Sequence, residues 1–515
     1  LVTSDSASAV LTVADGGVWN GNVTADTGSA SVTVNGTWNT GKLPGTDEVM
    51  PAYVSGGKLN VTVGEKGSMT GNVWAETGGS VTMDVAGTWT GAVKAPVIPE
   101  KWNEWLEIAK RMNSDAESAG TEAASTPAAL PGTVAVTLTG SKSVWNVTES
   151  TAVNSLSIGS GTVNFPAVSD ASSFTGSTLT VSGNYAGNGG TIVMNTALAG
   201  DDSATDKLVV KGDTSGETFI RVNNVGGRGE ATVNGIKLIE VGGKSEGTFE
   251  TAGTVRGGAY VYTLNQKGSD WYLTSLYTPP PVPRTHTVIK TDVTPEIQPD
   301  VTPEVTPAVT PAPLQAHLVR PEAASYATNL YAANTLFAMK LSDRLSGSAY
   351  ADALKNPKTN SRNVWLRTEG GHTRHEMADG QTTTRGNWGL VQAGGDLASF
   401  ATGGNHQFHV GLMAGFAHES AKTGSSVVNY RSKGKVSGYS AGIYGTWMNS
   451  DPTGTGPYVD TWLQYQRFKN TVDSSDYDVK ETYHTKGFTA SLEAGYTFGL
   501  RDWVSPNGVT NAARL

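Results

Sequence analysis

The sequence predicts an all-β protein in which a right-handed parallel β-helix precedes a Pro-rich linker, a helix and an incomplete β-barrel of about six strands. Glycine accounts for 63 of the 515 residues, well above the usual share of about 7%, and charged residues account for only 16%. Many segments alternate apolar with small polar side chains, and similar segments recur along the chain. This composition favours many short strands joined by tight turns.

The composition also excludes several classes of site. The chain has no cysteine, which excludes a disulfide scaffold, a thiol nucleophile and a cysteine-based zinc site. Its net charge of −9 disfavours binding to the phosphate backbone of a nucleic acid. No run approaches the roughly 18 apolar residues of a transmembrane helix. We expect no catalytic residue, no cofactor and no metal.

Residues 1–98 carry the clearest internal repeat. Residues 21–41 read GNVTADTGSASVTVNGTWNTG and residues 71–91 read GNVWAETGGSVTMDVAGTWTG, with a Gly-Thr-Trp turn in both. Short alternating strands that repeat at this spacing predict the stacked rungs of a β-helix. A β-sandwich with a chance duplication is the alternative. Leu1 is not an initiator and no secretory signal follows it, so we expect the chain to begin inside a repeat of something longer.

Residues 99–133 interrupt the repeat. The segment PEKWNEWLEIAKRM has apolar residues at 102, 105, 106, 109 and 112, which is helical spacing, and a proline near its start. We expect a helix that is inserted in the β-helix and lies on it, and a helix that docks a partner is the alternative. The Ala-, Ser- and Thr-rich remainder is predicted to be loop.

Residues 134–278 return to strands and end in aromatic residues. The segments TLTV at 178–181, KLVV at 207–210 and KLIEV at 237–241 are followed by GGAYVYTL at 257–264 and WYL at 271–273. In this order they resemble the end of the passenger in autotransporters of the pertactin type, where the last β-helix rungs form a self-folding cap, the autochaperone. The resemblance implies that the open end of the apolar core is sealed by Tyr260, Tyr262, Trp271 and Tyr272.

Residues 279–318 are predicted to be the linker. Ten prolines lie between Pro279 and Pro313, and five of them recur every four residues in 295–311. Such a segment cannot form a helix or a sheet ladder, so it predicts a stiff polyproline-like spacer between domains. An SH3-type ligand is the alternative.

Residues 319–346 have the composition of a helix. The Ala-rich segment at 320–339 resembles the helix that threads the barrel pore in autotransporters. Some members of that family cut their passenger free between two adjacent asparagines in this helix. Here Leu330 follows Asn329 and Thr335 follows Asn334, so this cleavage site is missing.

Residues 362–499 show long alternation of period two, as in FHVGLMAGF at 408–416 and FTASLEAGYTF at 488–498. An apolar outer face and about ten residues per strand are typical of outer-membrane barrels. Six strands are predicted, at 363–371, 386–399, 405–418, 436–449, 457–469 and 486–499. Aromatic girdles are predicted from Trp365, Tyr439, Trp447 and Tyr458. The segments VWLR at 364–367, GGH at 370–372 and QAGGD at 392–396 resemble the opening of an autotransporter barrel domain.

The end of the sequence departs from the pattern of autotransporter barrels. Autotransporter barrels have twelve strands and usually end in an aromatic residue, whereas residues 500–515 read LRDWVSPNGVTNAARL, without alternation. We therefore expect an irregular tail and a truncated translocator. Open sheet edges leave unpaired backbone groups in lipid, so we expect that the chain alone does not insert stably as a channel.

Two glycine-rich motifs resemble catalytic or phosphate-binding loops. Residues 212–216 read GDTSG, but Thr214 displaces the serine of a protease loop and no His–Asp pair accompanies it, so a turn between rungs is favoured. Residues 242–245 read GGKS but lack the first glycine of a phosphate loop. Neither motif is predicted to carry chemistry.

Ionisable residues of the predicted barrel are the other candidates. The pairs His372 with His375 and His406 with His409 lack acidic partners for a metal site, so solvated histidines are favoured. We expect Glu369, Asp396 and Glu493 to point into the barrel, where charges are tolerated, without forming a tuned acid–base pair.

The resemblance implies a self-transporting protein of the outer membrane, whose passenger lies at the cell surface and whose barrel is inserted by the barrel-assembly machinery. We expect an adhesin or a self-association factor of biofilms, not an enzyme. Its expected partners are a host surface or identical molecules on other cells, and no nucleic acid. The absence of cysteine fits this route, because a disulfide would block threading of an extended chain. A hydrolase passenger in a part before residue 1 and a non-functional remnant are the alternatives.

Overall fold

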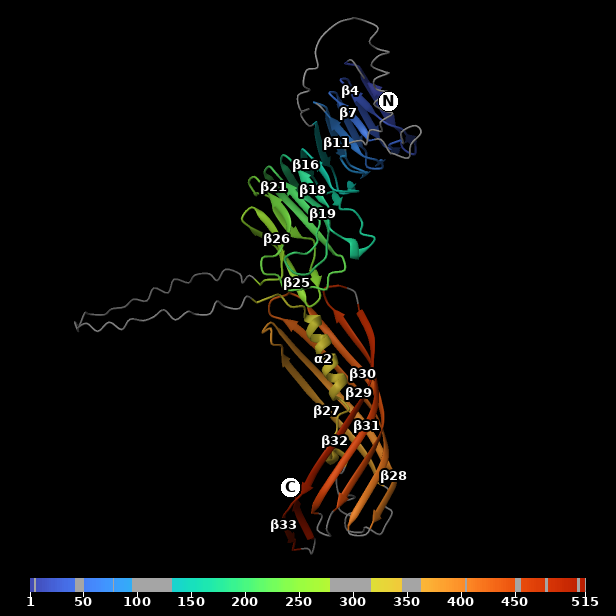
Figure 1. Ribbon diagram of the computed structural model, residues 1–515, viewed down its shortest axis with the longest axis vertical. Coiled ribbons are helices and arrows are strands. Elements are labelled where there is room, and N and C mark those ends of the chain that lie inside the picture. The colour runs from blue at the N-terminus through green and yellow to red at the C-terminus, as the bar shows by residue number, and fades with distance from the viewer. Residues whose placement is uncertain are drawn as a thin grey trace, which may run out of the picture. The chain divides into compact units, whose positions relative to one another are not determined.

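A computed structural model describes residues 1–3, 6–41, 51–76, 78–94, 132–277, 316–344, 363–402, 405–449, 455–477, 480–506 and 510–514. The chain divides into two compact units, Leu1–His317 and Leu318–Leu515 (Figure 1). The helix expected at 99–133 and most of the linker expected at 279–318 lie outside the described residues. Within these residues, every helix is too short or too polar to cross a membrane.

The first unit is a stack of rungs with strands on three faces, drawn in blue to green in Figure 1. The first face holds β1 (Val2–Thr3), β4 (Thr24–Asp26), β7 (Ala52–Ser55) and β10 (Val73–Glu76), and then β15 (Thr151–Val153), β18 (Thr178–Val181), β20 (Lys207–Val210) and β22 (Ile236–Val241). The second face holds β2 (Ser8–Val13), β5 (Ser29–Val34), β8 (Lys58–Val63), β11 (Ser80–Val85), β13 (Thr133–Leu138), β16 (Ser155–Ile158), β21 (Thr214–Asn224) and β23 (Thr248–Thr251). The third face holds β3 (Val18–Asn20), β6 (Thr37–Asn39), β9 (Ser68–Thr70), β12 (Thr88–Thr90), β14 (Val144–Asn146) and β17 (Thr162–Asn164).

Strand β19 (Tyr185–Thr196) joins the second and third faces, because it pairs with β16 and with β17. A 3-10 turn, η1 (Ala171–Ser173), precedes β18. The three last strands, β24 (Val255–Gly257), β25 (Tyr260–Lys267) and β26 (Asp270–Thr274), are antiparallel and end the parallel stack. The β-helix predicted from the repeat is therefore the fold of this unit.

Alternation of side chains explains why these segments are strands. Val32, Val61, Met83 and Val136 follow one another in register across β5, β8, β11 and β13, and all are buried. Each such side chain contributes about 1.5–3 kcal/mol when it leaves water. Their neighbours along β5, β8 and β11 are polar and point outward, so each rung adds one apolar side chain to a column of the core.

The tryptophans that recur on the third face, in β6, β12 and β14, have a physical reason. The indole N–H of Trp89 donates to the Gly71 carbonyl at 2.9 Å, and that of Trp145 donates to the Gly91 carbonyl at 3.0 Å. The two buried rings stack with centroids 4.6 Å apart. A Cβ at Gly91 would lie 2.1 Å from the Gly71 carbonyl oxygen, so this close approach of rungs requires glycine.

The second unit is a curved antiparallel sheet of six strands, in orange and red in Figure 1. They are β27 (Val364–Glu376), β28 (Thr382–Thr402), β29 (His406–Ser425), β30 (Arg431–Asn449), β31 (Gly456–Ser474) and β32 (Lys480–Thr497). Helix α2 (Pro321–Thr335) packs against the inner face of β28 to β31, and the short α3 (Leu341–Arg344) follows. The predicted number of strands is confirmed.

Three expectations about this unit need correction. The strands have 13–21 residues rather than about ten. The single helix expected at 319–346 is interrupted after Thr335. The tail expected to be irregular at 500–515 contains a hairpin of β33 (Gly499–Val504) and β34 (Thr510–Arg514), so the loss of alternation did not mean the loss of strand pairing.

Candidate functional sites: the cap of the β-helix and the helix seat

Aromatic residues close the end of the first unit, as the motifs implied. Trp271 and Tyr262 are buried, whereas Tyr260 and Tyr272 are only partly so. The Tyr262 hydroxyl donates to the Glu230 carbonyl at 2.6 Å and accepts from the Glu230 N–H at 2.9 Å. The cap therefore seals the apolar core with two large side chains and satisfies the polar atom of one.

The carboxylates of Asp201 and Asp206 connect loops near the cap through hydrogen bonds from backbone N–H groups. Asp201 accepts hydrogen bonds from three consecutive N–H groups, 233 to 235, at 2.7–2.9 Å. Desolvation is the largest single influence and raises its pKa, but the three backbone bonds together outweigh it, and the net pKa of Asp201 is lowered. For Asp206, which is almost fully buried, desolvation prevails over its bonds from Asn195 and Ser177 and raises the pKa.

The boundary of the predicted linker also changes. His317 forms an antiparallel bridge with Leu276, and its Nδ1 lies 3.0 Å from the Ser275 hydroxyl. The Tyr277 N–H donates to the Ala316 carbonyl at 2.8 Å. Residues 316 and 317, which the sequence assigned to the linker, are thus paired with the end of the β-helix.

Polar side chains of the sheet hold α2 along its length. The hydroxyl of Ser325 lies 3.1 Å from that of Thr423, which lies 2.7 Å from that of Thr384. The Asn329 amide donates to the Thr471 carbonyl at 3.2 Å. Asn329, considered above only as part of a cleavage site, is therefore an anchor of the helix.

The sheet also explains why α2 stops. The Phe337 carbonyl accepts from the Gln464 amide and the Met339 carbonyl from the Trp462 indole, both at 3.1 Å. These carbonyls accept hydrogen bonds from side chains of β31 instead of from backbone N–H groups of a further helical turn. Helical structure resumes in α3 at Leu341, whose N–H donates to Glu493 at 3.0 Å.

A buried ion pair fixes the last described residue of this segment. Arg344 pairs with Asp460, and both side chains are at most 3% exposed. The Thr446 hydroxyl donates to Asp460 at 2.6 Å, and the Arg344 guanidinium lies 4.2 Å from the centroid of the Tyr444 ring. The Tyr444 hydroxyl donates to Asp396 at 2.6 Å, so one network joins α3 to three strands.

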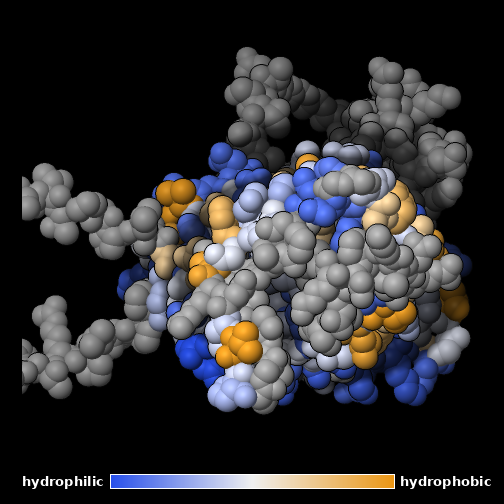
Figure 2. Space-filling view, turned by 90° about the horizontal axis from the view of Figure 1, so that it is seen from below, coloured by the Kyte–Doolittle hydropathy of each residue, from blue (hydrophilic) through white to orange (hydrophobic). Residues whose placement is uncertain are grey.

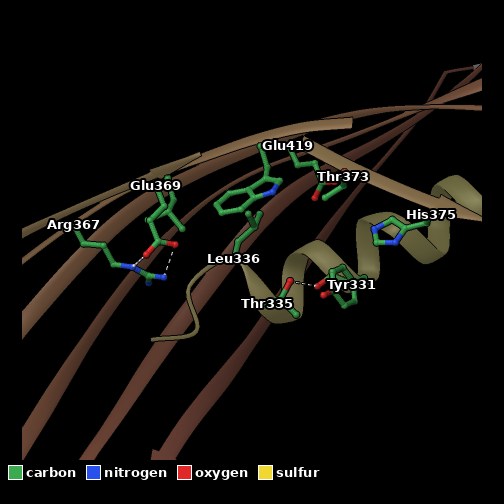
Figure 3. Close-up of a pocket in the computed structure, with 10 residues that line it drawn as sticks. Tyr331, Thr335, Leu336, Arg367, Glu369, Thr373, His375 and Glu419 are labelled. Atoms are coloured by element: carbon green, nitrogen blue, oxygen red, sulfur yellow. Dashed lines mark hydrogen bonds and ion pairs between the residues drawn. The ribbon is translucent and has the colours of Figure 1, made fainter. Parts of the chain in front are cut away.

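A cavity of about 220 Å³ remains between α2 and strands β27 to β29 (Figure 3). Its charges are largely paired: Arg367 forms two hydrogen bonds to Glu369, at 2.7 and 2.8 Å, and donates to Gln392. The buried Glu419 accepts from the Thr373 hydroxyl at 3.4 Å. The charged residues of this cavity are thus held by other side chains of the sheet.

The histidine pairs do not meet. His372 and His375 lie three residues apart on one strand, so they face opposite sides of the sheet, and the same holds for His406 and His409. His409 lies 2.9 Å from Asp396 on the inner face and is only 13% exposed, so the expectation of solvated histidines without acidic partners is wrong for this residue. Among the described residues, no group of three or more metal-ligating side chains is found.

The acidic residues Glu369, Asp396 and Glu493 do lie on the inner face of the curved sheet, the face that packs against α2 and α3, as predicted. Two girdle predictions are wrong: Trp365 is buried on the inner face, and the Tyr458 hydroxyl donates to the inward Glu493. Their parity along the strand, not their aromatic character, decides the face.

The outer face of the sheet is apolar, in agreement with the predicted alternation. Large side chains at 43–77% exposure include Val410, Leu412, Phe416, Tyr439, Ile443, Leu463, Phe488, Leu492 and Tyr496. Figure 2 shows hydrophobic residues interspersed with hydrophilic ones on the surface seen from below. A face of this kind suits contact with lipid.

The two glycine-rich motifs are corners of the β-helix. Asp213 precedes the first residue of β21, and residues 242–245 form the turn after β22. The turn expected at 212–216 is confined to Gly212 and Asp213, because Thr214 already begins β21.

Two family models match the chain. Residues 151–264 match "Autochaperone Domain Type 1", and residues 364–506 match "Autotransporter beta-domain". The first match covers the rungs from β15 onward and the cap as far as β25, and the second covers the six-stranded sheet.

 The uncharacterized protein YdeU of Escherichia coli K12 is 46% identical over 341 residues, which cover 65% of this chain and 69% of YdeU. The autotransporter adhesin AIDA-I of Escherichia coli is 36% identical over 342 residues, which cover 65% of this chain and 24% of AIDA-I. The autotransporter adhesin/invasin TibA of Escherichia coli is 27% identical over 487 residues, 87% of this chain and 44% of TibA. The chain thus spans only part of the length of these adhesins.

The crystal structure of the AIDA-I transport unit matches 38% of this chain and 58% of its own, at 35% identity and a TM-score of 0.32. Family membership rests on the two family models and on YdeU, of which the chain covers more than two thirds. The chain belongs to the autotransporter family, with a β-helical passenger exposed at the cell surface and a β-domain in the outer membrane.

Proposed function

We propose that the passenger is an adhesive surface, which joins the cell to identical molecules on other cells or to a host surface. Its relatives AIDA-I and TibA carry the name adhesin. The observation that carries the proposal is the second face, where the outward residues Ser31, Asn60 and Thr82 stand in register on β5, β8 and β11. A flat row of uncharged hydrogen-bonding groups suits a wide polar contact, at about one hydrogen bond per 100–200 Å².

The test is the settling of cells that display the chain. Asn60→Lys together with Thr82→Lys places like charges on the second face, so we expect settling to slow at least fivefold. Ser68→Lys with Thr88→Lys adds the same charges in register on the third face and is the matched control. Surface display is measured with an antibody in each case. Equal settling of both variants and the parent would contradict the proposal.

We also propose that the barrel-assembly machinery inserts the β-domain and that the six described strands do not close into a channel by themselves. Strands β27 and β32 each have one paired and one unpaired side among the described residues. Unpaired backbone groups cost several kcal/mol each in lipid, and barrels of fewer than eight strands are not usual. Heat-modifiable migration of the membrane-extracted chain would refute this second proposal. A hydrolase upstream of Leu1 stays a prediction that the preceding sequence would test.

A further inference from the structure

A groove of about 360 Å³ crosses four rungs on the second face of the passenger. It lies over β13, β16, β19 and β21, and its polar lining comes from Thr137, Ser155, Ser157, Asn184, Asp213 and Glu246. Its volume falls within the roughly 300–1,000 Å³ of small-molecule sites. The groove is therefore large enough for a ligand rather than for a single water.

Small side chains form the floor. Ser157, Ala186 and Ser215 are register partners on β16, β19 and β21, so no large side chain stands over the backbone there. The hydroxyls of Thr137, Ser155 and Ser157 have no hydrogen-bond partner within the part of the chain that the structure describes. These hydroxyls can each donate to and accept from a ligand.

The rim is fixed before any ligand arrives. The Asp213 N–H donates to Oδ1 of Asn184 at 3.0 Å, and the Lys244 N–H donates to Oδ1 of Asp213 at 2.7 Å. These bonds orient both side-chain planes and leave the Asn184 NH₂ group and the second Asp213 oxygen for other partners. A pre-ordered rim lowers the entropic cost of binding.

We propose that this groove binds a neutral saccharide through adjacent hydroxyl groups, an inference that rests on the proposed adhesive function and names its ligand. The fixed carboxylate of Asp213 accepts from sugar hydroxyls, the Asn184 amide donates to them, and the serine hydroxyls do both. Asp213 and Glu246 are both acidic and exposed, which disfavours anionic sugars. Among the described residues that line the groove, Tyr185 is the one aromatic residue and it is buried, so each groove binds weakly and many copies on one cell add avidity.

The experiment uses the full chain, folded in detergent micelles, on a printed array of mannose-, galactose- and glucose-containing oligosaccharides with their sialylated and sulfated counterparts. Ser157→Trp fills the floor, and we expect it to reduce binding at least tenfold. Asp213→Ala removes the fixed carboxylate and is expected to reduce binding similarly. Ser68→Trp places the same bulk outward on β9 of the third face, away from the groove, and is expected to bind as the parent does. Circular dichroism melting shows whether each variant is folded.

Binding of neutral sugars that Ser157→Trp abolishes and Ser68→Trp keeps supports the inference. No binding to any neutral sugar, equal binding by folded Ser157→Trp, or preferred binding of sialylated or sulfated sugars overturns it. The settling assay with the Asn60 and Thr82 variants does not involve the groove, so it reports separately on the adhesive function. Loss of array binding with intact settling would therefore reject the saccharide and leave the proposed function standing.

Discussion

At the scale of the residue, the passenger depends on polar atoms that bond from rung to rung. The indole of Trp145 does this in the core, and the carboxylate of Asp201 does it in the loops of the cap. A repeated fold stacks the same position many times, so a polar atom in that position must find a partner in the next rung. Glycine at the acceptor provides the close approach that this requires.

Trp145→Phe is expected to keep the aromatic stack and lose the hydrogen bond to Gly91. A buried carbonyl left without its donor costs about 1–3 kcal/mol, so the free energy of unfolding should fall by that amount. Urea unfolding followed by far-UV circular dichroism measures it. Trp19→Phe is the control, because the indole N–H of Trp19 has no hydrogen-bond partner among the described residues and its loss should cost less. Equal losses would show that only ring volume matters.

Asp201 makes the stability of the cap depend on pH. Its folded pKa is lowered, so its contribution is present above the unfolded pKa of about 3.9 and is lost as pH falls through the folded value. We expect Asp201→Asn to reduce the difference in unfolding midpoint between pH 6 and pH 3. Asp202→Asn, which removes a neighbouring carboxylate that accepts no hydrogen bond from described residues, should leave that difference as in the parent. A steeper pH dependence in Asp201→Asn would reverse the sign assigned to this group.

At the scale of the element, α2 and the sheet show what local sequence can and cannot predict. The alternation of apolar residues predicted all six strands, because it records which face meets lipid. It did not predict their length: β28 runs from Thr382 to Thr402, whereas the pattern covered 386–399. Residues 382–385 before this pattern are polar on both faces, and their pairing with β29 continues through backbone hydrogen bonds that side-chain patterns do not record.

The contacts that hold α2 and α3 on the inner face of the sheet were predictable only in part. Inward charges such as Asp396 and Glu493 follow from parity along a strand. The partner of Arg344 does not, because Asp460 lies 116 residues away and the sheet register decides which inward residue it meets. The end of α2 was missed for the same reason, since the carbonyls of Phe337 and Met339, just after the helix, bond to Gln464 and Trp462 on a distant strand.

Arg344→Met is expected to leave Asp460 buried and unpaired, which costs about 3–5 kcal/mol. Adding Asp460→Leu removes that charge, so the double variant should recover most of the loss. Thermal unfolding in detergent micelles gives the midpoints. Arg374→Met breaks an ion pair whose side chains are 59% and 69% exposed, so it should cost about 0–1 kcal/mol. A double variant as unstable as Arg344→Met alone would contradict the role of the unpaired charge.

At the scale of the whole molecule, the passenger is a stack in which each rung contacts only its neighbours. Stability in such a stack is close to a sum of rung and interface contributions, so local unfolding spreads inward from the ends. The antiparallel strands β24 to β26 protect the end near residue 273, where Trp271 packs edge-to-face on Phe249 at 5.3 Å. A destabilising substitution at this end should therefore increase local unfolding most in the rungs next to it.

Trp271→Ala removes a large buried side chain, a loss of about 3–5 kcal/mol. We expect amide hydrogen exchange, measured by mass spectrometry, to accelerate most in β20 and β22 and progressively less toward β11. Trp19→Ala, at the other end of the stack, should accelerate exchange in β2 to β6 and leave β22 protected as in the parent. Equal acceleration of all rungs in either variant would mean that the passenger unfolds as one cooperative unit, because a change confined to one end can spread evenly only if no rung opens before the others.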